Sequence, residues 1–320
     1  MRILFFARRK KSMQSTGHLA AGLRAAGHDV RMVRYGFWSQ FVGEAILDRY
    51  LRVFARVWTP DIVLVWKDCI SPGLMAAFSN RYHCIVYCID WFEEAPESIC
   101  RRARLADLFL LSHTGQFDMY RKAGIDRIAW LPQACDTDAY RPAASAGERF
   151  HSDVGFIGSP SSRGFDRSRL LERIDEEFDL KIWGPRWSTC GQRFRHAFDR
   201  EIYPAEYAQI CAGARIVLGC DISWHVTLYF SNRLWLTLGC GGFYLTNYLP
   251  QLETLFENHR HLVWYHSPEE CLELIRHYLP LEDERRRIAK AGLELVRSKH
   301  TYFHRANSLA EIVARLSAKV

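Results

Sequence analysis

The sequence predicts an α/β protein built from two doubly wound, Rossmann-like domains. In both halves, near-continuous apolar runs of strand length alternate with segments of helical periodicity. A stretch rich in Pro, Ala, Ser and Gly, Leu131 to Phe150, separates the halves and has no periodicity. The chain has 320 residues, 48% of them hydrophobic and 25% charged, which is enough for two domains with a core each.

The strand candidates are apolar on both faces, which is typical of parallel sheets covered by helices on both sides. In the first half we expect strands at residues 2–7, 29–35, 61–66, 84–89, 107–112 and 127–132, and helices at 15–27 and 45–58. In the second half we expect strands at residues 153–159, 180–185, 215–221, 241–247 and 261–266.

The domain boundaries follow from this pattern. We expect a first domain at residues 1–135, a hinge at 136–150, a second domain at 151–303 and an amphipathic C-terminal helix at 304–320 that packs back across the domains. The hinge contains Asp136, Thr137 and Asp138, which resemble a paired-carboxylate metal motif. Because they follow a strand at a domain junction, hinge and capping roles are favoured over metal binding.

Several protein classes are excluded by composition. No stretch approaches the roughly 18 apolar residues of a membrane span, and the opening "MRILFFARRKK" places its charges after the apolar residues, the reverse of a secretory signal. A cytoplasmic protein is therefore expected. The ten cysteines include no CxxC pair, and Cys84, Cys88 and Cys220 lie in strand-like runs. This pattern favours packed thiols over disulfides or a zinc site.

The stretch "SNRLWLTLGCGGFYLTNY", Ser231 to Tyr248, has the outline of an anion site. A helix that starts at Ser231 would be capped by its hydroxyl and would carry Arg233 in its first turn, where free backbone N–H groups favour an anion. Gly241 and Gly242 would cap the end of this helix and let it pack closely on the sheet.

Several motifs resemble a known enzyme family. The stretch "LPQACDTDAYRP" resembles the hinge of two-domain GT-B glycosyltransferases. The second half, through "DVGFIGS", "NRLWLTLGCGGFYLTNYLPQLETLF", "SPEECLELIRHYL" and "SKHTYFHRA", is similar to their CgeB-like (spore maturation protein-like) branch. The resemblance implies the GT-B fold, with a nucleotide-sugar donor site in the second domain facing a central crevice and an acceptor site in the first. It implies a UDP-sugar ahead of a GDP- or dTDP-sugar, and no obligatory metal.

A departing nucleotide diphosphate requires positive side chains and N–H groups aimed at it, and ligands bind beyond the carboxyl ends of such strands. Arg163 and Arg233 are the phosphate-contact candidates, although an arginine in a polar loop is more often a solvated surface charge. Trp187 either walls the nucleobase pocket or belongs to the core. The donor-site candidates are Gly158, Ser159, Arg163, Gly184, Trp187, Ser231, Asn232 and Arg233.

The first domain should supply any catalytic base. Candidates near the carboxyl ends of its strands are His18, Asp90 and His113. An inverting mechanism needs such a base and a retaining front-face mechanism does not, and the sequence leaves both open. Asp90 is the first choice, although an aspartate in front of a helix is as often a cap.

One position departs from the family pattern. Related GT-B enzymes carry a ribose-binding glutamate five residues before the glycine that ends the donor-site helix, and here that residue is Leu236. A leucine cannot accept these hydrogen bonds. The rival interpretation is therefore a non-catalytic nucleotide-sugar or glycan-binding protein on the same scaffold.

The net charge of +7 is uneven along the chain. Residues 1–150 hold 21 Lys and Arg against 15 Asp and Glu, whereas the remainder holds 22 against 21. Four basic residues, Arg8, Arg9, Lys10 and Lys11, follow the first strand. They form either a solvated loop or a contact for an acidic acceptor, such as a phosphate-bearing glycan, an anionic lipid surface or modified DNA. Nucleic acid is not preferred, because no binding motif accompanies the charge.

Overall fold

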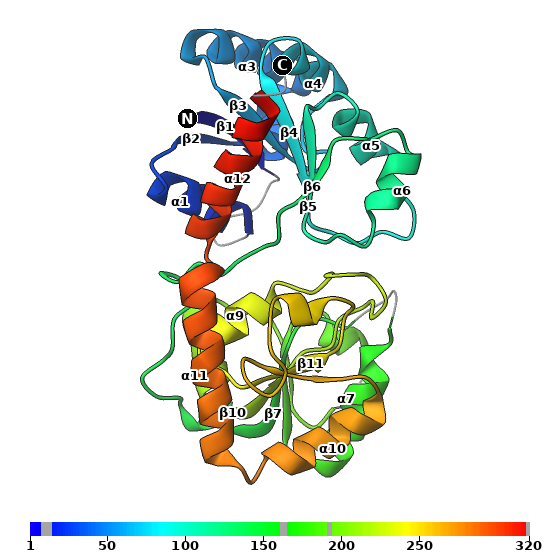
Figure 1. The fold of residues 1–320 in the computed structure, drawn as a ribbon, viewed down its shortest axis with the longest axis vertical. Coiled ribbons are helices and arrows are strands. Elements are labelled where there is room, and N and C mark those ends of the chain that lie inside the picture. Colours follow the sequence, from blue (N-terminus) through cyan, green and yellow to red (C-terminus); the bar gives the residue numbers. More distant parts are fainter. Residues whose placement is uncertain (8–14, 161–164, 191–193, 318–320) are drawn as a thin grey trace. The chain divides into compact units, whose positions relative to one another are not determined.

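The computed structural model describes residues 1–7, 15–160, 165–190 and 194–317. The chain divides into two compact units, Met1–Gln133 with Tyr302–Val320, and Ala134–Thr301 (Figure 1). Each unit holds a six-stranded sheet in which all strand pairs are parallel. The basic residues 8–11 and Arg163 lie outside the described residues.

The first unit has the strand order β2-β1-β3-β4-β5-β6. Its strands are β1 (Arg2–Ala7), β2 (Asp29–Arg34), β3 (Ile62–Trp66), β4 (His83–Cys88), β5 (Leu108–Leu111) and β6 (Ile128–Trp130). Its helices are α1 (Ser15–Ala25), α2 (Tyr35–Val42), α3 (Glu44–Trp58), α4 (Pro72–Ser79), α5 (Glu97–Ala103), α6 (Phe117–Lys122) and α12 (Tyr302–Ser317). All residues of β3 and β5 are buried, which explains their uninterrupted apolar sequences.

The C-terminal helix α12 belongs to the first unit and lies beside α1 (Figure 1). A Cβ atom at Gly22 would come within 2.5 Å of the backbone of Tyr302, so only glycine allows this approach. The Nε of Arg305 donates to the carbonyl oxygens of Pro132 at 3.1 Å and Gln133 at 3.2 Å. Burial lowers the pKa of Arg305 to about 10. The helix is thus held by both packing and polar contacts within its unit.

The second unit has the strand order β12-β11-β10-β7-β8-β9. Its strands are β7 (Ser152–Ile157), β8 (Leu180–Gly184), β9 (Ala197–Asp199), β10 (Ala214–Leu218), β11 (Tyr244–Asn247) and β12 (Val263–Tyr265). Its helices are α7 (Arg167–Glu177), α8 (Pro204–Gly213), α9 (Arg233–Gly239), α10 (Pro268–Tyr278) and α11 (Glu282–Lys299), with short 3-10 turns η1 (Glu148–Phe150), η2 (Trp187–Cys190) and η3 (Leu252–Thr254). The order reverses between β7 and β10, and ligands of doubly wound sheets bind at such a point.

The eleven strands that the sequence predicts are all present, with ends shifted by at most three residues. The elements that the sequence did not predict include a strand and a helix. The edge strand β9 has three residues, all exposed, and α2 follows β2 without a break. Cys84, Cys88 and Cys220 are buried in strands or beside them, as predicted, and burial raises the pKa of the Cys220 thiol to about 11.

One prediction about α9 is wrong. The helix begins at Arg233 with Asn232 at the N-cap position, and no side chain caps it. Asn232 already has helical angles (φ −57°, ψ −16°), whereas a capping residue is normally extended, and the Ser231 hydroxyl makes no hydrogen bond. The end of α9 does follow the prediction. Gly241 adopts φ +73°, and the N–H of Gly242 donates to the carbonyl oxygen of Thr237.

The segment with Asp136 also behaves as a turn. Its Oδ1 accepts from the N–H groups of Asp138 at 3.1 Å and Ala139 at 3.2 Å. The structure therefore gives this carboxylate the capping role that the sequence favours. Among the described residues, no three His, Cys, Asp or Glu side chains gather as potential metal ligands. None of the helices in the described ranges is long and apolar enough to span a membrane.

Candidate functional site

Three arginines from three different elements meet at the turn that follows β7. Arg233, the first residue of α9, donates from Nε to the carbonyl oxygen of Ile157 at 2.6 Å. Arg167, the first residue of α7, donates from Nη1 to the carbonyl oxygen of Ser159 at 3.4 Å. Arg186, in the loop after β8, donates from Nη2 to the Ser159 hydroxyl at 3.0 Å. We call Arg167, Arg186 and Arg233 the arginine cluster.

Two members of the arginine cluster are buried. Arg167 is 6% exposed and Arg233 is 8% exposed, and their guanidinium carbons lie 5.8 Å and 4.7 Å from the ring centre of Phe156. The Nε of Arg167 and the Nη1 of Arg233 are buried without a hydrogen-bond partner. Burial, and then the charge of Arg233, lower the pKa of Arg167. Buried donors without partners are rare, so this pair is suited to receive an anion with several oxygen atoms.

Glycine at two positions makes room for the arginine cluster. A Cβ at Gly158 would lie 2.9 Å from Nη2 of Arg233 and 3.1 Å from the Phe156 ring. Gly184 has φ +149°, and a Cβ there would lie 2.2 Å from the carbonyl oxygen of Gly158. Both residues are predicted donor-site positions. The structure shows that they allow the ends of β7 and β8 and the guanidinium group to approach closely.

A buried carboxylate lies beside the arginines. Asp221 is 3% exposed and follows β10, and its Oδ1 accepts from the N–H of Ser231 at 3.0 Å. Its Oδ2, the Ser231 hydroxyl and the Asn232 side-chain oxygen are buried without hydrogen-bond partners. The charge of Asp221 raises the pKa of Arg167, whereas burial and the charge of Arg233 lower it. One carboxylate facing two buried cations leaves a positive excess at this edge of the sheet.

Trp187 lies in the core, the alternative that the sequence left open. It is 2% exposed and packs edge-on against the rings of Phe156 and Phe194. Its Nε1 donates to the carbonyl oxygen of Gly158 at 2.6 Å. This contact fixes the turn that the arginine cluster surrounds.

Sequence reasoning missed Arg167 and Arg186. In the sequence, Arg167 looks like one of several arginines on a helix surface. The one signal that could have identified it is its position in the first turn of the helix that follows β7. Arg186 has φ +75°, held by its N–H donating to Asp199 at 2.6 Å. Non-glycine residues with such backbone angles concentrate at functional sites, but the sequence does not reveal them.

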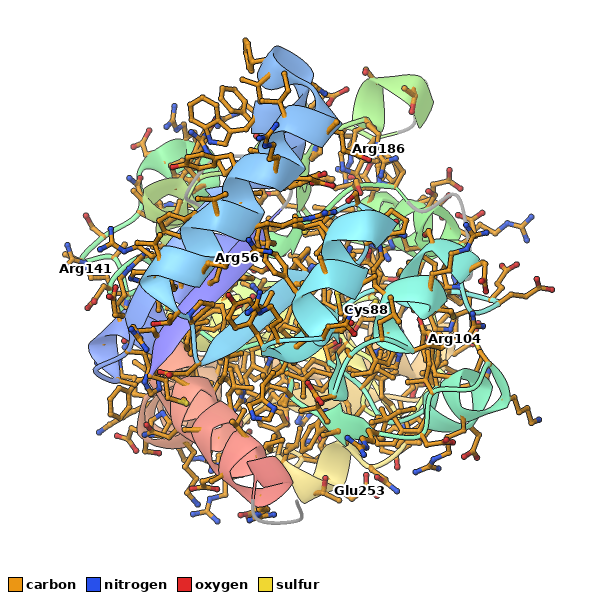
Figure 2. The ribbon with its side chains drawn as sticks, turned by 90° about the horizontal axis from the view of Figure 1, so that it is seen from above. Arg56, Cys88, Arg104, Arg141, Arg186 and Glu253 are labelled. Atoms are coloured by element: carbon orange, nitrogen blue, oxygen red, sulfur yellow. The ribbon has the colours of Figure 1, made fainter. Side chains whose placement is uncertain are left out.

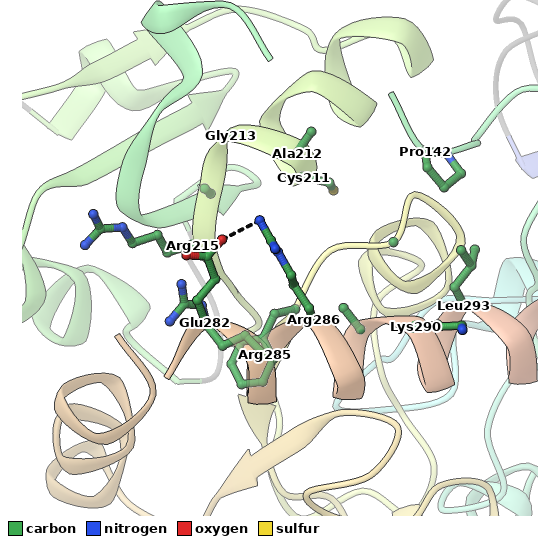
Figure 3. A pocket seen from close by; sticks show the side chains of 14 residues that line it. Pro142, Cys211, Ala212, Gly213, Arg215, Glu282, Arg285, Arg286, Lys290 and Leu293 are labelled. Atoms are coloured by element: carbon green, nitrogen blue, oxygen red, sulfur yellow. Dashed lines mark ion pairs between the residues drawn. The ribbon is translucent and has the colours of Figure 1, made fainter. Parts of the chain in front are cut away.

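A second basic cavity in the same unit is not a good candidate for the donor site. It measures about 410 Å³ and is lined by Arg215, Arg285, Arg286 and Lys290 (Figure 3). It lies where β10 begins, whereas ligands of this fold class bind at the carboxyl ends of the strands. Arg286 pairs with Glu282 across it, and Arg215 pairs with Asp153 at 3.2 Å. Of its four basic side chains, Arg215 and Arg286 are therefore compensated by carboxylates of the protein itself.

In the first unit, the carboxyl ends of three neighbouring strands carry Lys67, Asp90 and His113. Lys67 follows β3, adopts φ +57° and forms an ion pair with Asp90, which follows β4. The side chain of Asp90 is 46% exposed, whereas that of Lys67 is 11% exposed. Sequence reasoning missed Lys67, although it directly follows a predicted strand. The ion pair gives an oriented carboxylate that solvent can reach.

The two histidine candidates are buried. His113 is completely buried, its Nε2 lies 2.9 Å from Oε1 of Gln116, and burial lowers its pKa. His18 lies on α1 with its ring stacked on Tyr302 at 6.2 Å between ring centres. Of the three predicted catalytic residues, Asp90 therefore has the side chain that an acceptor hydroxyl could reach directly.

Comparisons with known proteins agree with this architecture. Residues 167–311 match the family model described as "Glycosyl transferase-like". This range includes α7 and α9 and therefore Arg167, Arg186 and Arg233. None of the curated proteins matches the chain.

Solved structures match over the whole length. Sucrose-phosphate synthase from Thermosynechococcus elongatus is 11% identical with a TM-score of 0.73, and all of both chains is covered. HepE of Anabaena in complex with UDP-glucose is 12% identical with a TM-score of 0.69, covering 98% of this chain and 100% of that one. AviGT4, a glycosyltransferase of avilamycin A biosynthesis, is 16% identical with a TM-score of 0.66, covering 100% and 98%. The structures confirm the predicted GT-B fold, and the family match confirms the predicted class of enzyme, a glycosyltransferase.

Proposed function

We propose that the protein transfers a sugar from a nucleotide diphosphate sugar to a hydroxyl acceptor, as a member of the CgeB-like branch. The observation that carries the proposal is the arginine cluster around residues 157–159, with two buried guanidinium groups whose donors lack partners. When the glycosidic bond to the donor breaks, negative charge accumulates on the diphosphate. Fixed guanidinium groups in a buried site stabilise this charge more than water does.

The arginine cluster divides into two kinds of contact. Arg167 and Arg233 are fixed by burial and by bonds to backbone carbonyls, so they would hold the diphosphate without reorganisation. Arg186 is exposed and reaches the Ser159 hydroxyl, so it can exchange this contact for a phosphate oxygen. We therefore assign the diphosphate, rather than the sugar or the base, to this edge of the sheet.

Uridine is the preferred nucleoside. HepE of Anabaena was solved with UDP-glucose, with UDP and glucose, and with UDP. An E. coli protein that is 9% identical, with a TM-score of 0.68, was solved with UDP-2-fluoro glucose. These ligands belong to those proteins, and their shared uridine diphosphate favours UDP over GDP or dTDP for this chain.

Asp90 is our candidate for the base in an inverting transfer. Its carboxylate is partly exposed and is oriented by Lys67, as a base that meets an acceptor hydroxyl should be. His113 would then support the loop after β4, which contains Asp90, instead of reacting. Gln116 links the two, because it contacts Nε2 of His113 and donates to the carbonyl oxygen of Phe92 in that loop.

Calorimetric titration with UDP, GDP and dTDP, followed by transfer assays with UDP-sugars, tests the proposal. We expect UDP to bind and a UDP-sugar to be consumed. Leu236, which cannot accept from ribose hydroxyls, favours the alternative of a binding protein on this scaffold. Tight UDP binding without transfer or hydrolysis would support that alternative, and no binding of any nucleotide would reject both.

We further propose an acidic acceptor, because nearly all of the net charge lies in residues 1–150. Changing Arg8, Arg9, Lys10 and Lys11 together to Ser should raise the apparent KM for a polyanionic acceptor and leave donor binding intact. If that acceptor is DNA, the log–log salt slope of roughly −0.9 per phosphate contacted should also flatten. Unchanged acceptor kinetics and an unchanged salt response would show that these four residues form a solvated loop and do not contact the acceptor.

A further inference from the structure

The first unit exposes an apolar surface on α2 and α3. Twelve large hydrophobic side chains are exposed in the described part of the chain, and seven of them lie on these two adjacent helices. These seven are Trp38, Phe41, Val42, Ile46, Tyr50, Val53 and Val57. We call them the α2–α3 surface. A concentration of this kind on a folded protein marks an interaction surface.

The sequence of α3 builds this surface with helical spacing. Ile46, Tyr50, Val53 and Val57 recur at intervals of four, three and four residues, so they form one stripe. Their exposed fractions are 67%, 62%, 53% and 81%. A separate stripe with Leu47, Leu51 and Ala55 faces the core of the unit. The outer stripe is therefore not needed for folding, and α3 has two apolar faces.

A row of arginines flanks the outer stripe. Arg49, Arg52 and Arg56 recur at intervals of three and four residues between the two apolar faces, and all three are exposed (Figure 2 labels Arg56 on α3). Of the acidic residues on α3, Glu44 is exposed at the first position, while Asp48 is buried and accepts from Tyr35 at 2.6 Å and from Ser71. The helix α2 has no charged residue. The surface therefore combines exposed apolar groups with a positive edge.

Beside the outer stripe lies a groove of about 740 Å³. Trp38, Val42, Ile46 and Tyr50 contribute to its lining, and Arg24 and Arg31 also border it. An apolar depression bordered by guanidinium groups suits a partner that presents hydrocarbon and anionic phosphate together.

We propose that the α2–α3 surface docks the protein onto an anionic membrane surface. In an interfacial helix, apolar and aromatic side chains enter the boundary between headgroups and acyl chains, and arginines reach the lipid phosphates from their edge. The alternation of Ile46, Tyr50, Val53 and Val57 with the arginine row has this geometry. A second copy of the chain fits less well, because both surfaces of such a contact would be positive, and α2 and α3 offer Glu44 as their one exposed acidic residue. The inference does not depend on the sugar-transfer proposal.

Vesicle flotation of the intact protein tests it. Vesicles of phosphatidylcholine with phosphatidylglycerol should bind the protein, and vesicles of phosphatidylcholine alone should bind it at least several-fold more weakly. Binding to the anionic vesicles should weaken as salt is added, because the arginines act through screened charges. Failure to bind anionic vesicles, or equal binding to both kinds, would overturn the proposal.

Two variants separate the apolar and the basic contributions. The variant Ile46→Ser/Val53→Ser/Val57→Ser and the variant Arg49→Gln/Arg56→Gln should each lower the partition coefficient roughly 10-fold. All five side chains are exposed, so folding should persist, which circular dichroism checks. A control in the same unit, Leu105→Ser/Arg81→Gln, changes exposed residues elsewhere and should bind as the wild type does.

Two further outcomes would reject the membrane as the partner. Variants that bind anionic vesicles as tightly as the wild type would remove the α2–α3 surface from the contact. A wild-type dimer that the triple serine variant converts to a monomer, in a protein that ignores vesicles, would assign the surface to a second copy of the chain. Light scattering on both proteins measures this.

Discussion

Both sheets bury basic side chains at their carboxyl ends, but they compensate the charge in different ways. In the second unit, Arg167 and Arg233 cannot lose their protons and keep donors without partners. In the first unit, Lys67 is neutralised by Asp90, and burial lowers the pKa of His113 so that its ring is neutral at pH 7. The arginines of the second unit therefore need an external anion as a partner, whereas the charges of the first unit are compensated within the protein. The proposed roles of Arg233 and Asp90 would therefore place anion binding and proton transfer in different units.

The largest expected effect concerns the first unit. Asp90→Asn keeps the shape of the side chain and removes its ability to accept a proton. If Asp90 is the base, kcat should fall by roughly 10²- to 10⁴-fold, while UDP binding in the second unit stays unchanged. Transfer kinetics and calorimetry measure the two effects. Asp68→Asn, in the neighbouring loop after β3, is the control, because Asp68 accepts from Ser98 at 2.8 Å and has no predicted role in transfer.

A retaining front-face reaction would give a different result. Transfer that stays near the wild-type rate in Asp90→Asn would show that the carboxylate is no base, and Asp90 would then be a structural partner of Lys67.

The next effect concerns the second unit. Arg233→Ala removes a buried guanidinium group that would contact the diphosphate, so UDP binding should weaken roughly 10-fold or more, at 1.4 kcal/mol per factor of ten. Arg169→Ala is the matched control, because the Arg169 side chain is 86% exposed on the same helix as Arg167. Unchanged UDP binding by calorimetry, in an Arg233→Ala protein that folds normally, would remove this residue from the site.

The difference between the two units also explains what the sequence could predict. Strands such as Ile62–Trp66 are apolar throughout, and their order along the chain predicts parallel sheets. The sequence could single out Asp90 and Arg233 as candidates because Asp90 follows a predicted strand and Arg233 begins a predicted helix. Candidate-site residues that come from distant segments, such as Arg186, were missed because their convergence depends on tertiary structure. Trp187 was ambiguous for a related reason, since burial and ligand contact select the same side chain.

A smaller effect tests how tightly the arginine site is built. Gly158→Ala adds one methyl group 2.9 Å from Nη2 of Arg233, while the Nε of Arg233 is fixed by the carbonyl oxygen of Ile157. The guanidinium group must then shift from its present position, and restoring that position in the complex should cost about 1 kcal/mol, so UDP binding should weaken roughly 5-fold. Gly36→Ala, where a Cβ meets nothing within 4 Å, is the control and should not alter the affinity. Equal UDP affinities of the wild type and both variants would mean that UDP binding does not depend on the position of Arg233.

The smallest effect concerns the positive charge that burial keeps off His113 in the first unit. The pKa of His113 is lowered from 6.5 by burial, so below pH 6.5 the unfolded chain takes up a proton that the folded chain resists. The contribution of His113 to folding stability is therefore fully present above pH 6.5 and is lost as the pH falls toward the lowered pKa.

In His113→Gln the loss of stability that comes from this histidine should disappear, because glutamine does not titrate. Urea unfolding of both proteins at pH 7.5 and pH 5.5 measures it, and comparing the two pH values within each protein cancels any packing cost of the substitution. His151→Gln, at an exposed histidine of the second unit, should keep the wild-type loss. If His113→Gln loses as much stability on acidification as the wild type does, then His113 carries no pH-dependent cost, and the contrast with the permanently charged arginines would not hold.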